Sequence, residues 1–417
     1  MGPGEPARPD AAAFGCLIAF AAVTYAAPAE WIPAAGLLRP ALATSGLALA
    51  LMVVGKLARR EGLTMDGARG WAFAAFAGLA AASTRWSIDP PSSVGLAVEL
   101  AKSVAIYVTL VNLVTSSRRL ALLCGALVVG SMVTSVGVLD YVASGRPLVE
   151  GFRARWVGLY ADPNRMAMSL GIVVPLGAAL AIRRGTRKWA RVAGVAAAGL
   201  AAWAMVLSHS RGGLAGLAVA LGVWTLLERR AAQTLLVAAL AAAVVALAPA
   251  SFWDRAGTVA RFQEDASAMG RVHAWTVAAR ASSENPLVGI GAGGFQTAWV
   301  RYAPPESHRA YAAHNFFLQV VGELGLVGLL LFLVFVSGGV AGAFAASSDE
   351  EVGPWARALA AALSGYLVSS LFAGFLASQH FYVLVGLAAA AHRLSLGRTS
   401  DTCAHILVKA LDGGGAR

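Results

Sequence analysis

Charged side chains are scarce in this chain, because they make up 13% of its 417 residues while hydrophobic side chains make up 58%. Soluble domains usually carry charge on about a quarter of their residues. The composition therefore excludes an ordinary water-soluble domain and is typical of an integral membrane protein.

Cysteine is also rare, and the known catalytic motifs are missing. Cys16, Cys124 and Cys403 lie far apart and form no CxxC pair, which argues against a disulfide framework or a zinc site. The sequence lacks a P-loop, a G-x-S-x-G elbow and an external D-x-D motif that could hold a metal with a nucleotide sugar. We therefore expect chemistry that needs no metal and no cofactor.

Long apolar runs fill the chain instead. About twelve of them are long enough to cross roughly 30 Å of hydrocarbon as helices. They lie near residues 12–28, 41–57, 70–84, 94–114, 120–143, 166–182, 189–207, 212–227, 231–250, 315–343, 357–376 and 380–394. The sequence thus predicts an all-α polytopic membrane protein with about 12 transmembrane helices.

Lysine and arginine gather in alternate connections between these runs, and the positive-inside rule makes that side cytoplasmic. Both termini then lie in the cytoplasm. We expect a single membrane domain over residues 1–417, with one long periplasmic loop, 251–313, packed on it between helices 9 and 10, and a short cytoplasmic tail, 395–417. The same bias explains the net charge of +11, so no nucleic-acid partner is expected.

The predicted periplasmic side carries more arginines than the rule allows. Arg153, Arg155 and Arg165 occupy the connection 144–165, and Arg211 opens the next span on that side. Guanidinium groups supply fixed charge and a planar fork of donors that suits phosphate oxygens. These arginines indicate a phosphate-bearing ligand, with interfacial lipid phosphate as the alternative.

Arg211 stands at the start of the stretch "LSHSRGGLAGL". Gly212 and Gly216 have the small-xxx-small spacing that permits close helix packing. A helix N-terminus adds partial positive charge, so Arg211 and the exposed amides there could bind phosphate. The alternative is an arginine that snorkels to the membrane surface.

The stretch "RAYAAHNFFLQVVGELGLVG", residues 309–328, places His314 and Asn315 before an apolar, glycine-containing run. At 100° per residue, Gly325 lies about 20° from His314, which predicts a shared face that packs inward. The helix dipole should keep His314 neutral and able to accept a proton from a hydroxyl. A cap or interface role is the alternative for His314, and Asn315 either orients the imidazole or caps the helix.

Four stretches in order resemble the O-antigen ligase and O-antigen polymerase family of bacterial envelope glycan enzymes. They are "GLYADPNRMAMSLG", "LSHSRGGLAGL", "GRVHAWTVAARASSENPLVGIGAGGF" and "AHNFFLQVVGELGLVG". The resemblance implies a multi-pass protein of the bacterial inner (plasma) membrane whose active site faces the periplasm. It also implies an inverting glycosyltransferase whose donor is a glycan linked to undecaprenyl pyrophosphate.

The resemblance assigns roles to particular residues. Arg211 matches the arginine of the family's "SRG" motif, Arg271 that of the "GR…W" motif, and His314 the histidine before the glycines. The two arginines would bind the pyrophosphate, and His314 would act as the base on the acceptor hydroxyl. The secondary candidates are Asn164, Arg165, Arg153, Arg155, Arg301 and Asn315.

Three functions remain open at this stage. An O-antigen ligase, the leading hypothesis, would use lipid A core as the acceptor in lipopolysaccharide biosynthesis, whereas a polymerase would use another lipid-linked repeat. A non-enzymatic lipid-linked glycan transporter is the third, although transporters usually show repeated halves and broken helices near the midplane. Membrane lipids are the remaining partners that we expect.

Overall fold

The computed structural model describes residues 8–229, 266–307 and 309–413. Across these residues the regular secondary structure is helical. The described residues form no strand, and Val149 and Arg153 form an isolated bridge. Within this part of the chain, seven helices are long and apolar enough to cross a membrane: Ala34–Ala58, Pro90–Leu113, Ser117–Ala143, Pro163–Ile182, Lys188–Leu207, Arg211–Glu228 and Phe316–Ser348. The chain is therefore a polytopic α-helical membrane protein.

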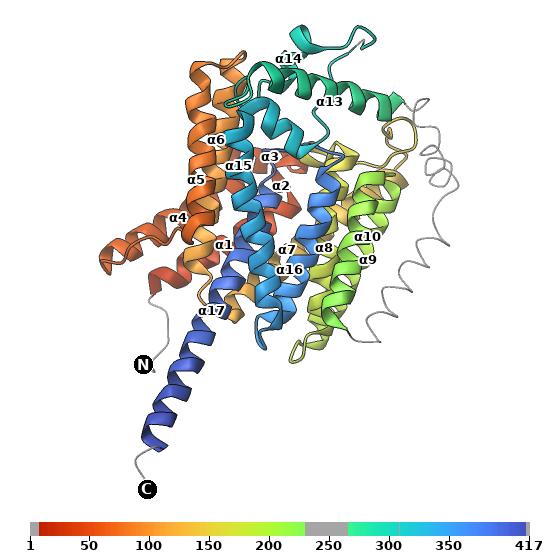
Figure 1. Ribbon diagram of the computed structural model, residues 1–417. Coiled ribbons are helices and arrows are strands. Elements are labelled where there is room, and N and C mark those ends of the chain that lie inside the picture. The colour runs from red at the N-terminus through yellow and green to blue at the C-terminus, as the bar shows by residue number, and fades with distance from the viewer. Residues whose placement is uncertain (1–7, 230–265, 308, 414–417) are drawn as a thin grey trace.

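The predicted apolar runs fall on helices of the structure, apart from the run at 231–250, which lies outside the described residues. The long helices are α1 (Arg8–Ala26), α4 (Pro40–Ala58), α5 (Gly67–Ala82), α6 (Pro90–Leu113), α7 (Ser117–Ala143), α8 (Pro163–Ile182), α9 (Lys188–Leu207), α10 (Arg211–Glu228), α15 (Phe316–Ala345), α16 (Gly353–Ser370) and α17 (Gln379–Gly413). In the predicted tail, α17 continues without a break through residue 413 and extends past the bundle (Figure 1).

Two helices from the predicted long loop lie across one end of the bundle (Figure 1): α13 (Ala266–Glu284) and α14 (Phe295–Tyr302). The stretch 271–282 of the motif "GRVHAWTVAARASSENPLVGIGAGGF" lies within α13. The residues from 251 to 265 are outside the part that the structure describes. We call the end of the bundle across which α13 and α14 lie the α13 end. It is the end at which α7 finishes and at which α8, α10 and α15 begin.

Small residues let α10 and α16 approach closely. A Cβ on Gly216 would lie 2.3 Å from the carbonyl oxygen of Gly365, and one on Gly212 would lie 2.8 Å from Cβ of Phe372. The hydroxyl of Ser369 donates to the carbonyl of Gly212 at 3.1 Å. The predicted small-xxx-small packing is thus confirmed, and it fixes the start of α10 where Arg211 stands.

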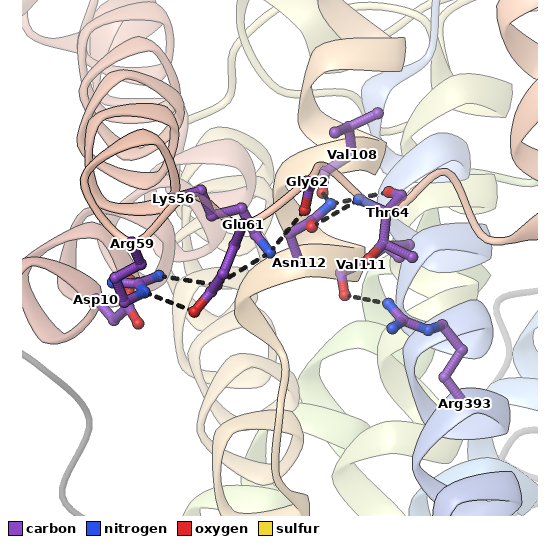
Figure 2. A network of polar contacts seen from close by, with 10 residues as sticks. All are labelled: Asp10, Lys56, Arg59, Glu61, Gly62, Thr64, Val108, Val111, Asn112 and Arg393. Atoms are coloured by element: carbon purple, nitrogen blue, oxygen red, sulfur yellow. Dashed lines mark hydrogen bonds and ion pairs between the residues drawn. The ribbon is translucent and has the colours of Figure 1, made fainter.

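The opposite end of the bundle is joined by a polar network (Figure 2). Arg59 after α4 pairs with Asp10 of α1 at 3.1 Å and with Glu61 at 2.9 Å. Asn112 of α6 exchanges two hydrogen bonds with the backbone of Thr64, at 2.9 and 3.0 Å. These contacts link α1, α4 and α6 at the end away from α13.

Candidate catalytic site at the α13 end

The N-termini of α8 and α10 meet through Asn164. Its Oδ1 accepts hydrogen bonds from Ser210 Oγ at 2.9 Å and from Arg153 Nη2 at 2.8 Å. Ser210 is the N-cap of α10 and accepts from the amide of Gly213 at 3.2 Å. Asp162 caps α8 by accepting from the amides of Asn164 and Arg165. Two positive helix ends therefore lie side by side, directly before Arg211.

Arg153 is buried beneath these helix ends, with 5% of its surface exposed. Its Nε donates to the carbonyl of Ser208 at 3.1 Å, and its Nη1 lies 3.4 Å from Glu150. These contacts join the connection 144–162 to the turn between α9 and α10. The sequence indicates a phosphate-bearing ligand for Arg153, and the structure places its side chain in buried hydrogen bonds that position these helix ends.

His314 lies in the turn that leads into α15, with a left-handed φ of 50°. The helix begins at Phe316, after the N-cap Asn315. The predicted shared face of His314 and Gly325 is therefore wrong, because the 100° spacing holds only inside a helix. The turn conformation, which few non-glycine residues adopt, sets the direction of the imidazole.

Several charges surround His314. Burial lowers the pKa of His314 to about 4, and Arg271 is the next cause. Arg153 and Arg309 lower this pKa further, whereas Asp162 raises it. The imidazole is thus neutral near pH 7, as predicted, but burial and guanidinium groups are the physical causes. The charges of Arg271, in α13, and of Arg153 therefore act on the imidazole of His314.

Asn315 caps α15, which answers one question that the sequence left open. Its Oδ1 accepts from the amides of Phe317 and Leu318, both at 3.0 Å. Its Nδ2 donates to the carbonyl of Leu371 at 3.3 Å, in the connection between α16 and α17. Because the carboxamide is used in this way, Asn315 positions the backbone next to His314.

The segment that follows α13 packs against the glycines of α15. Gly325 breaks the helix with φ 64° and ψ −166°. A Cβ there would lie 2.3 Å from the carbonyl carbon of Leu287. The amides of Ile290 and Gly291 donate to the carbonyls of Gly322 and Glu323, at 3.1 and 2.9 Å. The glycines thus permit a backbone crossing that holds α13, and with it Arg271, against α15.

The other predicted arginines lie in different surroundings. Arg165 places its guanidinium 4.4 Å from the centre of the Phe375 ring. Arg155 donates to the hydroxyl of Tyr141 at 3.3 Å, toward α7. Arg301 pairs with Glu284 at 2.6 Å on the exposed surface of α14. Neither Arg155 nor Arg301 is among the charges that shift the pKa of His314, and Arg301 is exposed to solvent.

Arg211, the first residue of α10, is half-buried. It is not among the charges that shift the pKa of His314. Ser210, the residue before Arg211, donates a hydrogen bond to Asn164. Asn164 accepts a second hydrogen bond from Arg153, and this pair of bonds connects the start of α10 to the site. The three primary candidates therefore come from three elements that meet at one end of the bundle.

Sequence reasoning missed three contributors. Asp162 and Ser210 are short polar residues directly before apolar runs, which is the usual signal of an N-cap. Arg309 has no comparable signal; its guanidinium lies 4.5 Å from the centre of the Tyr311 ring. Within the described ranges, no three His, Cys, Asp or Glu side chains converge as metal ligands would.

Comparison with known proteins supports the family resemblance. The family model described as O-antigen ligase matches residues 196–333. This stretch contains Arg211, Arg271 and His314, and it confirms the resemblance seen in the sequence. Asn164 and the arginines of the connection 144–165 lie outside it.

A curated relative supports the same family. The exopolysaccharide production protein ExoQ of Rhizobium meliloti (strain 1021) is 29% identical over 198 residues, which cover 42% of this chain and 44% of the relative. The alignment thus spans less than half the length of that protein. It supports the family resemblance, and it leaves the reaction and the substrates to be argued from the site.

Proposed function

We propose that the chain is an O-antigen ligase, a glycosyltransferase that moves a glycan from undecaprenyl pyrophosphate to a sugar hydroxyl of lipid A core without a metal. The observation that carries the proposal is the neutral His314, which is half-buried and lies within reach of the charges of Arg271 and Arg153. A neutral imidazole can accept a proton, and guanidinium groups can stabilise a pyrophosphate.

The proposed reaction is a single displacement that inverts the anomeric carbon. His314 takes the proton of the acceptor hydroxyl while that oxygen attacks the anomeric carbon of the donor sugar. The bond from this carbon to the pyrophosphate oxygen breaks, and undecaprenyl pyrophosphate leaves with the electron pair. Arg211 and Arg271 stabilise its negative charge, an effect worth about 10²- to 10³-fold in rate per well-placed donor.

Donor binding should also make His314 a better base. The free site holds the pKa of His314 at about 4 partly because Arg271 and Arg153 repel a proton there. A bound pyrophosphate offsets these positive charges, so the pKa of His314 rises when the donor is present. Proton abstraction is thereby linked to the presence of the leaving group.

The remaining candidates support this site in the proposal. Asn164, Arg153 and Asn315 position the helix ends, as their hydrogen bonds to Ser210, Ser208 and Leu371 indicate. The guanidinium of Arg165 lies over the ring of Phe375. Arg155 and Arg301 are left as contacts for the glycan or for lipid phosphate beyond the reacting atoms.

The proposed topology has about 12 transmembrane helices in a single membrane domain, with both termini and the tail 395–417 in the cytoplasm. The loop 251–313, which contains α13 and α14, lies in the periplasm, and the active site faces that side of the inner membrane. The argument is the positive-inside rule, together with the meeting of Arg211, Arg271 and His314 at the end that lacks the main lysine and arginine clusters.

Polymerisation of lipid-linked repeats is the second candidate. The observation that favours it is the similarity to a protein named for exopolysaccharide production. Such a polymerase would use the same attack by a hydroxyl on an undecaprenyl-pyrophosphate-linked glycan, with another lipid-linked chain as the acceptor.

A transfer assay separates the candidates. Purified full-length protein is incubated with undecaprenyl-pyrophosphate-linked glycan, with and without lipid A core. Glycan-extended lipid A supports the ligase, and longer lipid-linked chains in the absence of lipid A support the polymerase. If neither product forms and the donor instead crosses the bilayer of protein-containing vesicles, the enzyme proposal fails in favour of a transporter.

A further inference from the structure

A groove of 620 Å³ opens at the α13 end, where α7 finishes. Its lining includes Trp31 of the short helix α2 (Pro28–Trp31), Trp156 of the connection between α7 and α8, and residues of α7. None of the residues that contribute to the proposed reaction lines this groove. It is therefore a separate feature, which calls for its own explanation.

The groove changes from apolar to polar along one face of α7. Val133 and Val136 are 37% and 51% exposed, and Asp140 follows one helical turn later. The rise of a helix places Asp140 about 10 Å from Val133 along the axis. At this polar end Asp140 pairs with Arg146 at 3.8 Å. An occupant of this groove needs an apolar part and a polar head.

Trp31 presents an open aromatic face at the polar end. The indole is 45% exposed, although its N–H already donates to the carbonyl of Ala26 at 2.8 Å. A tryptophan that anchors a protein at the membrane interface directs its N–H to water or lipid head groups. Trp31 instead uses its N–H internally and leaves its ring face free.

Trp156 forms the floor behind this face. Its ring centre lies 6.3 Å from that of Trp31, at an interplanar angle of 39°. The indole packs directly on Gly137, where a Cβ would lie 2.2 Å from the ring. Packing on α7 fixes Trp156, so the two tryptophans form a rigid aromatic surface.

This surface suits a sugar ring. The C–H face of a pyranose is apolar and slightly positive, which matches the negative face of an indole. Its hydroxyl groups can donate to Asp140 and accept from Arg146 at the rim. A phospholipid phosphate fits less well, because Arg146, the cation that lines the groove, already pairs with a carboxylate.

The groove is connected to the catalytic site through the backbone. Arg153, near His314, precedes Trp156 by three residues in the same connection. Between them, the amide of Ala154 donates to the carbonyl of Leu207 at 2.8 Å. The amide of Trp156 donates to the carbonyl of Tyr160 at 3.0 Å, so the connection is held at both ends.

We propose that this groove binds the acceptor, a membrane glycolipid whose sugar lies on Trp31 and whose chain lies along Val133 and Val136. The inference rests on the proposed glycosyl transfer, since it names the acceptor class of that reaction. It holds for either acceptor, because lipid A core and lipid-linked repeats both carry a sugar on a membrane anchor.

Native mass spectrometry of the full-length protein tests the proposal, with lactosylceramide as the glycolipid probe and phosphatidylglycerol as the comparison. We expect the wild type to retain lactosylceramide in preference to phosphatidylglycerol. Trp31→Ala should weaken glycolipid retention by about tenfold, while Trp31→Phe keeps most of it because an aromatic face remains. Trp189→Ala removes another exposed indole, at the start of α9, and should leave retention unchanged.

Equal retention of the two lipids, or unchanged lactosylceramide retention by Trp31→Ala, would overturn the glycolipid site. The binding assay needs no transfer, so His314→Ala should bind the probe as the wild type does. A site that binds glycolipid in a protein without transferase activity contradicts only the proposed function. Transfer in which the KM for the acceptor is the same in Trp31→Ala contradicts only the groove.

Discussion

The charges around His314 are arranged differently from the buried ion pairs at the opposite end of the bundle. Away from α13, cations contact carboxylates: Arg69 lies 2.5 Å from Asp66, and Arg357 lies 2.7 Å from Glu228. At the α13 end, Arg271, Arg153 and Arg309 lower the pKa of His314, and Asp162 opposes them.

The difference indicates what each end does. Opposite charges at contact distance join helices, and their removal leaves a buried charge without compensation. Guanidinium groups gathered around one imidazole repel a proton, which is unfavourable until an anion binds. The first arrangement maintains the fold, and the second is expected to hold a ligand.

The largest effect is expected from His314→Ala. Loss of the base should reduce transfer by about 10²- to 10⁴-fold, because the acceptor hydroxyl then has no proton acceptor. The rate of product formation at saturating donor and acceptor measures this. His392→Ala, in α17 against Gly342, is the matched control and should keep the wild-type rate. Full transfer by His314→Ala would remove the base from the mechanism.

The next largest effect is expected from Arg271→Gln. This variant should have kcat/KM for the donor reduced by about 10²- to 10³-fold, because stabilisation of the leaving group is lost. Arg280→Gln is the control, since Arg280 is exposed on the same helix, α13, and donates to the backbone carbonyl of Tyr302. Its kcat/KM should stay close to that of the wild type. Equal losses in both variants would indicate a general effect of positive charge at this end.

At the other end, Arg69→Ala should affect stability and leave the chemistry unchanged. Arg69 is 8% exposed, pairs with Asp66 and donates to the carbonyl of Gly338. Breaking a buried pair costs about 3 to 5 kcal/mol. Unfolding in detergent measures the loss, and transfer per folded molecule should stay constant. A lower rate per folded molecule would show that the two ends are coupled.

The smallest effect concerns pH. The base form of His314 is lost as the pH falls through its pKa of about 4, so kcat/KM should decline only in that acid range. Arg309→Ala removes a charge that repels the proton, so the pKa of His314 rises and the decline moves to higher pH. Profiles of kcat/KM against pH for both proteins test this, and an unmoved acid limb in Arg309→Ala would contradict it.

Part of the candidate site could be predicted from the sequence. The order of the "SRG", "GR…W" and "AHN" stretches pointed to Arg211, Arg271 and His314 before any coordinates. The predicted apolar runs within the described residues fall on long helices, because the hydrocarbon demands long apolar segments with internally bonded backbones. The role of Asn315 was left open between two alternatives, and its hydrogen bonds identify it as a cap.

The use of the glycines could not be predicted from a helical wheel. The wheel assumes unbroken helix from residue 314 onward, whereas His314 has a left-handed φ and Gly325 interrupts α15. The break at Gly325 lies where the segment 286–291 forms hydrogen bonds with α15. Sequence spacing contains no record of such a partner, since it comes from a distant part of the chain.

The sequence by itself determined that the chain is helical and membrane-spanning, because composition and run length are local properties that the bilayer selects directly. It also indicated the family, through short motifs. The tertiary structure alone decided that Arg153 is buried under two helix ends, that Arg309 acts on His314, and that Trp31 faces Trp156. These depend on contacts between distant segments, which packing of the whole bundle brings together.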